Sequence, residues 1–390
     1  MIYKKDNIIY YIIPPLTIMN PIISQISEDQ GHLYFRIAQC NVSIANALRR
    51  IILSEIPTIV FRTSPYERNN STFDINTTRL NNELIKQRLS CIPIHISDTE
   101  FPYKNYIIEV DKKNEGDAID YVTTADFKIK DLITNTYLTP AATKAIFPPN
   151  ALTGDYIDFV RLRPRISENI SGEHLKMSCT LDIGMAKEDN AFNITSTCAY
   201  ACSLDETKIK QTWLAKEAEL KKNGIKKEDI EFAERDWHFL DARRIFIPDS
   251  FDFVLQTVGP FDNMAIIFKA AHVMLRKLID FKNTIQAEPD LIVASEATIA
   301  NSFDINIPRE GYTLGKVIEF VLYNMHYGKT LTYCGFRKPH PHIDLSLIRL
   351  GFSDAADKAV VTSYLLGAAD EAIKVFTKIA SAFDTTMLKK

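Results

Sequence analysis

The 390-residue chain lacks the features that mark several large classes of protein. Its formal net charge is −3, whereas a free-standing nucleic-acid-binding protein would usually carry an excess of basic residues. It also has no long hydrophobic run, because the apolar stretch Tyr10–Ile18 is interrupted by Pro14 and Pro15 and is far too short to span a bilayer. The same stretch has no convincing small-residue cleavage site, so we expect neither a signal peptide nor a membrane partner.

Cysteine is scarce. Without a secretory signal, the cysteines are interpreted as reduced thiols of a cytosolic protein. Only Cys198 and Cys202, with Cys179 upstream, approach the spacing of metal ligands, and no second pair completes a set of four. We therefore expect small buried thiols, no metal and no cofactor. The six cysteines are Cys40, Cys91, Cys179, Cys198, Cys202 and Cys334.

Motifs for catalysis are missing as well. The sequence contains no glycine-rich phosphate loop, no nucleophile elbow and no paired metal-binding aspartates. Histidines cluster only in Lys338–His342, where His340 and His342 could point the same way on an extended strand. The favoured interpretation is a rigid loop, and a metal-dependent enzyme that uses these histidines and a cysteine stays open as an alternative.

The most informative segment that is present predicts an amphipathic helix. Ser43 can cap it by accepting a bond from a free backbone amide. Ile44, Leu48 and Ile51 recur at helical spacing, and Pro57 ends the pattern. A helix with this stripe is expected to pack against a partner helix.

This segment resembles a known family. The phrase Ser-Ile-Ala-Asn-Ala-Leu-Arg-Arg-Ile-Ile-Leu-Ser-Glu-Ile-Pro-Thr (43–58) is similar to the first helix of the alpha-like subunits of multisubunit RNA polymerases. A second phrase, with Asn76, Glu83, Arg88 and Pro93 around a short predicted helix, is similar to the eukaryotic and archaeal branch. In that branch it belongs to the third-largest subunit of RNA polymerase II and to its archaeal counterpart.

The C-terminal third resembles a different polypeptide of the same enzymes. Gly311–Leu322 and Tyr333–His342 carry Thr-Leu-Gly followed by Gly-x-x-x-Pro-His-Pro. This pattern is similar to the small partner polypeptide, which is the eleventh subunit of RNA polymerase II or its archaeal counterpart. The resemblance implies a fusion of two subunits from a large cytoplasmic DNA virus, located in the host cytoplasm or viral factory or packaged in the virion.

The order of the predicted elements indicates an α+β fold with two copies of one unit, each a mixed sheet packed on helices. We expect the first dimerisation unit to comprise residues 1–95 plus 246–285, and the second to comprise residues 286–390. Residues 96–245 are expected to form a mostly β insert subdomain. Gln286–Asp290 is the expected junction between the fused halves.

Within the insert, Leu175–Ile183 is predicted as one of several strands. Ala215–Lys222 and Glu228–Leu240 are predicted as charged surface helices, with Gly224 as a helix stop between them. The segment that begins at Gly184 resembles a loop of the family's second domain, but Asp189 stands where the family has a histidine.

Aligning Ser43 with Thr313 superimposes the two apolar stripes of the repeat. We expect the two units to form an intramolecular pseudo-dimer through these stripes. The predicted interface consists of Ile44, Leu48, Ile51, Leu314, Ile318 and Val321.

The resemblance implies a non-catalytic assembly platform that holds the largest and second-largest polymerase subunits. Small polymerase subunits are further expected partners, and nucleic acid is reached only through the complex. The guanidinium groups of Arg49 and Arg50 could each offer a planar fork to carboxylates or carbonyls of a partner, although such a pair of charges ordinarily indicates a solvated helix face. A stand-alone transcription regulator that mimics the platform is the alternative. The predicted docking residues are Asn46, Arg49, Arg50, Glu83 and Arg88.

Overall fold

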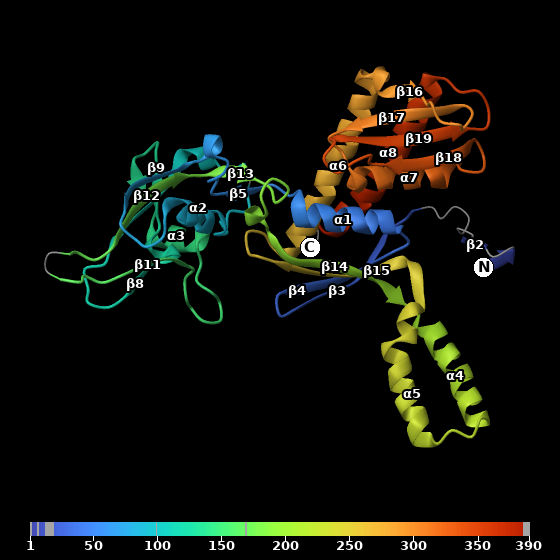
Figure 1. The fold of residues 1–390 in the computed structure, drawn as a ribbon, viewed down its shortest axis with the longest axis horizontal. Helices are drawn as coiled ribbons and strands as arrows, with labels where there is room; N and C mark the ends of the chain where they lie inside the picture. Colours follow the sequence, from blue (N-terminus) through green and yellow to red (C-terminus); the bar gives the residue numbers. More distant parts are fainter. Residues whose placement is uncertain (1, 6–7, 12–18, 99, 168–169, 385–390) are drawn as a thin grey trace. The chain divides into compact units, whose positions relative to one another are not determined.

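The computed structural model describes residues 2–5, 8–11, 19–98, 100–167 and 170–384. Residues 12–18 of the apolar stretch noted above lie outside this part of the chain. Figure 1 shows sheets and helices in both halves of the sequence, which confirms the predicted α+β fold class. Among the described residues, no helix is long and apolar enough to cross a membrane.

The chain forms two compact units. Unit 1 contains Met1–Ile51, Cys198–Leu255 and Ile267–Lys390, and unit 2 contains Ile52–Thr197 and Gln256–Ile266. The division into two dimerisation units and an insert subdomain stays a prediction.

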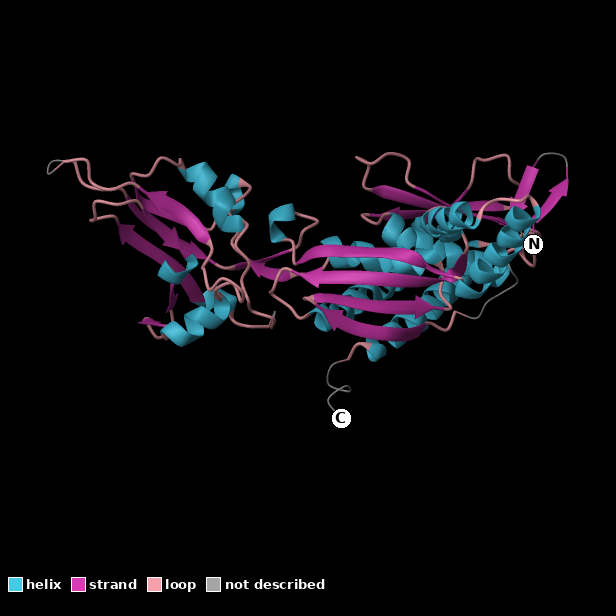
Figure 2. Cartoon of the chain, turned by 90° about the horizontal axis from the view of Figure 1, so that it is seen from below, coloured by secondary structure: helices cyan, strands magenta, loops and turns pink. Residues whose placement is uncertain are grey.

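The first half of unit 1 is built on a four-stranded sheet. Its strands follow the order β14-β15-β4-β3, and Figure 2 shows helices on one face of it. Residues of β4 alternate between buried and more exposed positions, as expected of a strand with one face on a core. The strands are β3 (Ile22–Asp29), β4 (His32–Ala38), β14 (Thr195–Leu204) and β15 (Phe246–Thr257). The helices of this half are α1 (Val42–Ser54) and α6 (Asn263–Ala287).

The second half of unit 1 repeats this plan. A four-stranded sheet has the order β16-β17-β19-β18, and two helices follow its strands in the sequence order of the first half. The expected junction coincides with the end of α6 and a short 3-10 turn over Pro289–Leu291. The elements are β16 (Ile292–Ala294), β17 (Ser302–Pro308), α7 (Tyr312–His326), β18 (Leu331–Arg337), β19 (Leu345–Phe352) and α8 (Lys358–Ala382).

An arginine–aspartate pair occurs at the centre of each sheet. Arg36 on β4 donates to both carboxylate oxygens of Asp252 on β15, at 2.5 and 2.9 Å. Arg349 on β19 donates in the same two-pronged way to Asp304 on β17, at 2.6 and 2.7 Å. Two-pronged pairs of this kind are strong and directional, so they fix the register of neighbouring strands in both sheets.

Several contacts join the two halves within unit 1. Lys277 on α6 forms an ion pair with Glu310, which precedes α7, at 2.9 Å. The ring of Phe35 on β4 packs edge-on against Phe383, which follows α8, with a centroid separation of 5.1 Å. These contacts involve both a buried aromatic pair and charged groups, so the two halves touch each other within unit 1.

A helical hairpin connects β14 to β15. It consists of α4 (Glu206–Lys222) and α5 (Lys227–Phe239), which lie side by side in Figure 1. Gly224 between them has φ +73°, a left-handed conformation that glycine adopts without strain. Both helices were predicted, and α4 begins nine residues earlier than expected (Glu206 against Ala215) because Asp205 caps it by accepting a bond from the Lys208 amide.

Unit 2 is mostly β. Its largest sheet has the order β10-β9-β7-β12-β6, and two smaller pairs are β11-β8 and β13-β5. Large apolar side chains, among them Phe61, Phe127 and Phe159, fill the core between these sheets and the helices. The strands are β5 (Thr58–Val60), β6 (Ser71–Asn76), β7 (Tyr106–Lys113), β8 (Asp120–Thr123), β9 (Lys128–Asp131), β10 (Thr136–Tyr137), β11 (Asp158–Leu162), β12 (His174–Thr180) and β13 (Asp182–Gly184). The helices are α2 (Asn82–Ser90) and α3 (Pro140–Ile146), and the hairpin formed by β1 (Ile2–Lys5) and β2 (Ile8–Tyr11) belongs to unit 1.

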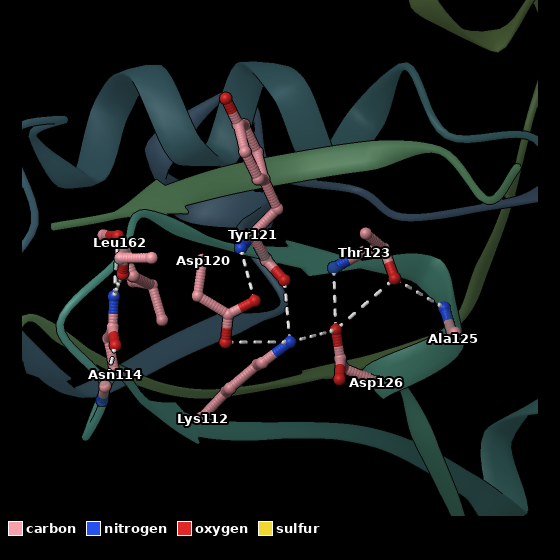
Figure 3. A network of polar contacts seen from close by, with 10 residues as sticks. Lys112, Asn114, Asp120, Tyr121, Thr123, Ala125, Asp126 and Leu162 are labelled. Carbon is pink, nitrogen blue, oxygen red and sulfur yellow. Dashed lines mark hydrogen bonds and ion pairs between the residues drawn. The ribbon is translucent and has the colours of Figure 1, made fainter. Parts of the chain in front are cut away.

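A lysine joins two of these sheets. Lys112 on β7 lies between the carboxylates of Asp120 and Asp126 and donates to the carbonyl of Tyr121 at 2.7 Å (Figure 3). Asp126 also accepts from the Thr123 amide, which closes a capping box. One ammonium group therefore holds the β8 strand and the turn after it against the main sheet.

The single strand predicted over Leu175–Ile183 is wrong. The chain forms β12 and then β13, because β12 pairs with β6 and β7 whereas β13 pairs with β5. Apolar and polar residues alternate without interruption from Leu175 to Ile183, and such a pattern cannot reveal a change of partner strand.

Candidate docking site

The helix α1 is capped by a residue other than the predicted one. The side chain of Asn41 accepts from the Ser43 amide at 2.9 Å, and its carbonyl accepts from the Ile44 amide at 3.0 Å. The Ser43 hydroxyl is buried and has no hydrogen-bond partner among the described residues. The Ser43 cap is therefore wrong, because the helix begins one residue before it and Asn41 occupies the cap position.

The six predicted interface residues all lie in the core of unit 1. Ile44, Leu48 and Ile51 on α1 are completely buried. On α7, Leu314 and Ile318 are completely buried and Val321 is 1% exposed. The burial of both stripes agrees with helices that pack on apolar neighbours, and their assignment to a pseudo-dimer interface stays a prediction.

The glycine of the Thr-Leu-Gly phrase at the start of α7, Gly315, lies where there is no room for a side chain. A Cβ atom at this position would lie 2.0 Å from a ring carbon of Phe336 on β18. The ring of Phe336 also packs edge-on against Tyr312, with centroids 5.2 Å apart. The absence of a side chain at Gly315 thus lets β18 approach the helix.

The helices α1 and α7 line a common groove of about 620 Å³. Arg50 on α1 donates from Nε to the hydroxyl of Thr313 on α7 at 2.9 Å, which links the two helices at the groove. The groove has an aromatic lining with charged groups of both signs, a combination suited to a protein segment. Its lining includes Asn46, Arg50, Tyr200, Tyr312, Lys316 and Glu319.

Arg49 and Arg50 differ in their surroundings. Arg49 is half-buried and donates from Nε and Nη2 to the side-chain oxygen of Asn46, at 3.1 and 2.8 Å. Arg50 is exposed and reaches the groove. Asn46 therefore orients one guanidinium while Thr313 orients the other, and the predicted docking set on α1 forms a single cluster.

The other two predicted docking residues lie in unit 2. Glu83 is exposed on α2 and pairs with Lys86 at 2.8 Å, not with Arg88. Arg88 donates to the carbonyls of Phe159 and Asp158, at 2.7 and 2.8 Å. Arg88 thus anchors α2 to β11, and docking roles for both residues stay predictions.

All six cysteines are free, and the expectation of buried thiols is right for Cys40, Cys179 and Cys198 but wrong for Cys91, which is exposed; Cys202 and Cys334 are half-buried. Burial raises the pKa of the thiols of Cys40, Cys179, Cys198 and Cys334 to about 12. Thiols with such pKa values stay protonated at neutral pH, and metals bind the thiolate. Within the described part of the chain, no three His, Cys, Asp or Glu side chains lie close enough together to hold a metal ion.

The two histidines of the proline-rich loop contact each other. Their rings are 5.0 Å apart, and the His342 amide donates to Nδ1 of His340 at 3.1 Å. One ring nitrogen of His340 is therefore already engaged with the backbone, which fits a rigid loop.

Sequence reasoning missed several residues of the groove. Thr313, which accepts from Arg50, is equivalent to Ser43 in the aligned repeat, but this equivalence does not predict its contact with α1. Tyr200, Tyr312 and Lys316 were missed because no periodic pattern links β14 to two helices far apart in the sequence. The loop residue Asp189 caps a 3-10 turn by accepting from the Ala191 amide at 2.9 Å, which gives this departure from the family pattern a local role.

Known proteins are similar to parts of this sequence. Residues 34–278 match the RNA polymerase Rpb3/Rpb11 dimerisation domain, a region that includes α1 and most of α6. The chain is 32% identical over 131 residues to DNA-directed RNA polymerases I and III subunit RPAC1 of Homo sapiens, which covers 33% of this chain and 32% of that protein. It is 23% identical over 286 residues to DNA-directed RNA polymerase II subunit RPB3 of Schizosaccharomyces pombe, which covers 70% of this chain and 90% of that protein.

A third relative is subunit 3B of DNA-directed RNA polymerases IV and V of Arabidopsis thaliana, with 38% identity over 72 residues, or 18% of this chain and 20% of that protein. The chain thus spans about a third of the human protein and about a fifth of the Arabidopsis one.

Proposed function

Because the chain belongs to the RNA polymerase Rpb3/Rpb11 dimerisation-domain family, we propose that it is a non-catalytic assembly subunit of a DNA-directed RNA polymerase. In this proposal it holds the largest and second-largest subunits and contacts small polymerase subunits. The observation that carries the proposal is the family match over α1, combined with the groove that α1 and α7 line together. The motif survey of the sequence supports the non-catalytic part.

The proposal includes a fusion of two partner subunits into one chain. Its support is the repeated order of sheet and helices on either side of residue 286, and the Arg–Asp pair that recurs in each sheet. A short tether sets a local concentration in the mM range, so two fused halves need not find each other in solution. The match to the family ends at residue 278, so the likeness of the C-terminal third to the small partner polypeptide rests on the Gly311–His342 motifs alone.

The proposed setting is a large cytoplasmic DNA virus, with the chain in the host cytoplasm, the viral factory or the virion. This part rests on the fused arrangement. It is tested by locating the tagged chain in infected cells and in purified particles.

In this proposal Arg49 and Arg50 bind the large subunits. Replacing both with alanine should leave the isolated chain folded, because alanine keeps helix propensity and neither guanidinium is deeply buried. Capture of the large subunits should weaken roughly thirty-fold, since truncation of an interface hot spot commonly costs about 2 kcal/mol. Quantitative pull-down and calorimetric melting on the same preparation measure both effects.

Two control variants sharpen this experiment. Arg276→Ala removes another exposed arginine of unit 1, on α6, and should leave capture unchanged. Thr313→Val removes the hydroxyl that accepts from Arg50 while keeping the shape of the side chain. If Arg50 only ties α1 to α7, Thr313→Val will reproduce the effect of Arg50→Ala, and the docking role is refuted. Undiminished capture by the double alanine variant refutes it equally.

A further inference from the structure

The hairpin of α4 and α5 contains its own small core. Trp213 and Trp237 lie 6.2 Å apart between the helices, and Ile209 and Ile230 pack with them. All members of this cluster fall within the hairpin and the short turn after it. The apolar side chains on the inner face of the hairpin are therefore buried against one another and not against the two sheets.

The outer face of α5 carries two exposed aromatic side chains. Phe232 and Phe239 are 69% and 68% exposed, and they are seven residues apart. This spacing puts both rings on one face, about 10 Å apart along the helix, while Ile230 and Trp237 point to the core. Two exposed aromatic anchors at i and i+7 are typical of helices that bind in a partner's groove.

The charges beside these rings are mainly acidic. Glu228 and Asp236 lie on the same face by helical spacing and are exposed, with Arg235 as the basic exception. An acidic border favours a partner with basic residues and opposes adsorption to an anionic lipid surface.

We propose that the outer face of α5 binds a second protein through an apolar groove bordered by lysine or arginine, with Phe232 and Phe239 as the two anchors. Aromatic side chains are enriched in protein interfaces and commonly supply their hot spots. This surface is separate from the groove of α1 and α7, and the proposal does not rest on the proposed function.

Photo-crosslinking tests the proposal in the full chain. Arg235 lies between the two anchors, so Arg235→benzoylphenylalanine places the reactive group at the centre of the surface. The labelled chain is irradiated in an extract of the cells that express it naturally, and the crosslinked peptide is sequenced. The proposal expects one protein, crosslinked within an apolar groove that has basic residues at its border.

The identified protein is then purified and titrated with the unlabelled chain. Phe232→Ala and Phe239→Ala should each weaken binding at least tenfold, and Glu228→Lys with Asp236→Lys should weaken it further. Tyr66→Ala, which truncates an 84%-exposed aromatic residue of unit 2, should change nothing. All variants should melt as the parent does, because the Trp213–Trp237 core is untouched.

Several results would overturn the proposal. They are a crosslink to a second copy of the chain, sedimentation with vesicles of phosphatidylcholine and phosphatidylserine, the absence of any discrete crosslinked protein, and affinity that the phenylalanine changes do not alter. The Arg49→Ala/Arg50→Ala chain should give the same crosslink as the parent, so failure here is distinguishable from failure of the polymerase docking role.

Discussion

Gly315→Ala should destabilise the fold, although alanine has a higher helix propensity than glycine. In an unhindered helix, replacing glycine by alanine stabilises the fold by about 0.5–1 kcal/mol. At Gly315, however, the added Cβ would lie 2.0, 2.2 and 2.6 Å from three ring carbons of Phe336. Carbon atoms in contact are normally about 3.5–4.0 Å apart, so the ring must move by more than about 1 Å.

A shift of the Phe336 ring would also disturb its edge-on contact with Tyr312. Overpacking of this kind typically costs about 1–3 kcal/mol. Subtracting the propensity gain of about 0.5–1 kcal/mol leaves a range of roughly 0–2.5 kcal/mol, so we expect Gly315→Ala to lower the free energy of unfolding by about 1 kcal/mol. The midpoint of thermal unfolding should fall by several degrees, since about 1 kcal/mol corresponds to roughly 2–4 °C in domains of about 150–250 residues.

Gly367→Ala on α8 is the matched control. A Cβ at Gly367 would meet no atom within 4 Å, so this change should be stabilising by about 0.5–1 kcal/mol. In a Phe336→Ala background, Gly315→Ala should also become stabilising, because the obstructing ring is gone. Calorimetry is the suitable assay, since both tryptophans lie in the α4–α5 hairpin and their fluorescence would report that element. A Gly315→Ala chain as stabilised as the Gly367→Ala chain would refute the packing of α7 against β18.

Two further predictions concern the core and the sheets. Leu48→Asp places a charge at a fully buried site and should lower the free energy of unfolding by several kcal/mol. Val42→Asp, at the exposed first position of the same helix, should be neutral or slightly stabilising. Equal melting temperatures of the two variants would contradict the burial of this stripe. Arg349→Met should cost about 1–3 kcal/mol at neutral pH, because it leaves the buried Asp304 carboxylate without its two-pronged partner. The bond with Arg349 lowers the pKa of Asp304, so this stabilisation is present above the ordinary Asp pKa of 3.8 and disappears as the pH falls through the lowered value; a penalty that persists in acid would argue against the ion pair.

The helices could be predicted from the sequence because the residues that indicate them lie close together in the chain. The stripe of α1, its end before Pro57 and the glycine at the turn of the hairpin are all visible within a few residues. The cap of α1 was predicted wrongly at Ser43 because Asn41 and Ser43 are both good capping residues, and only the backbone decides which one occupies the position.

Features that depend on distant contacts were harder to predict. The split of Leu175–Ile183 into β12 and β13 depends on two different partner strands, which the run itself does not encode. The bond from Arg50 to Thr313 joins two residues that are hundreds of positions apart in the chain. Tyr200 likewise lines the groove from a strand, whereas most of the other lining residues belong to α1 and α7. The contacts of Arg88 with the carbonyls of β11 were likewise not predicted, because those strand residues lie about 70 positions further along the chain, and its docking role stays a prediction.

If this chain is an assembly subunit of a DNA-directed RNA polymerase, it must occur in the native enzyme at a fixed stoichiometry. The tagged chain should be purified under native conditions from the cells that express it naturally, and the co-eluting proteins should be quantified by mass spectrometry. We predict one copy of the chain for each copy of the largest and second-largest polymerase subunits. Elution of the chain apart from both large subunits, while a complete polymerase is present in the same extract, would contradict the account.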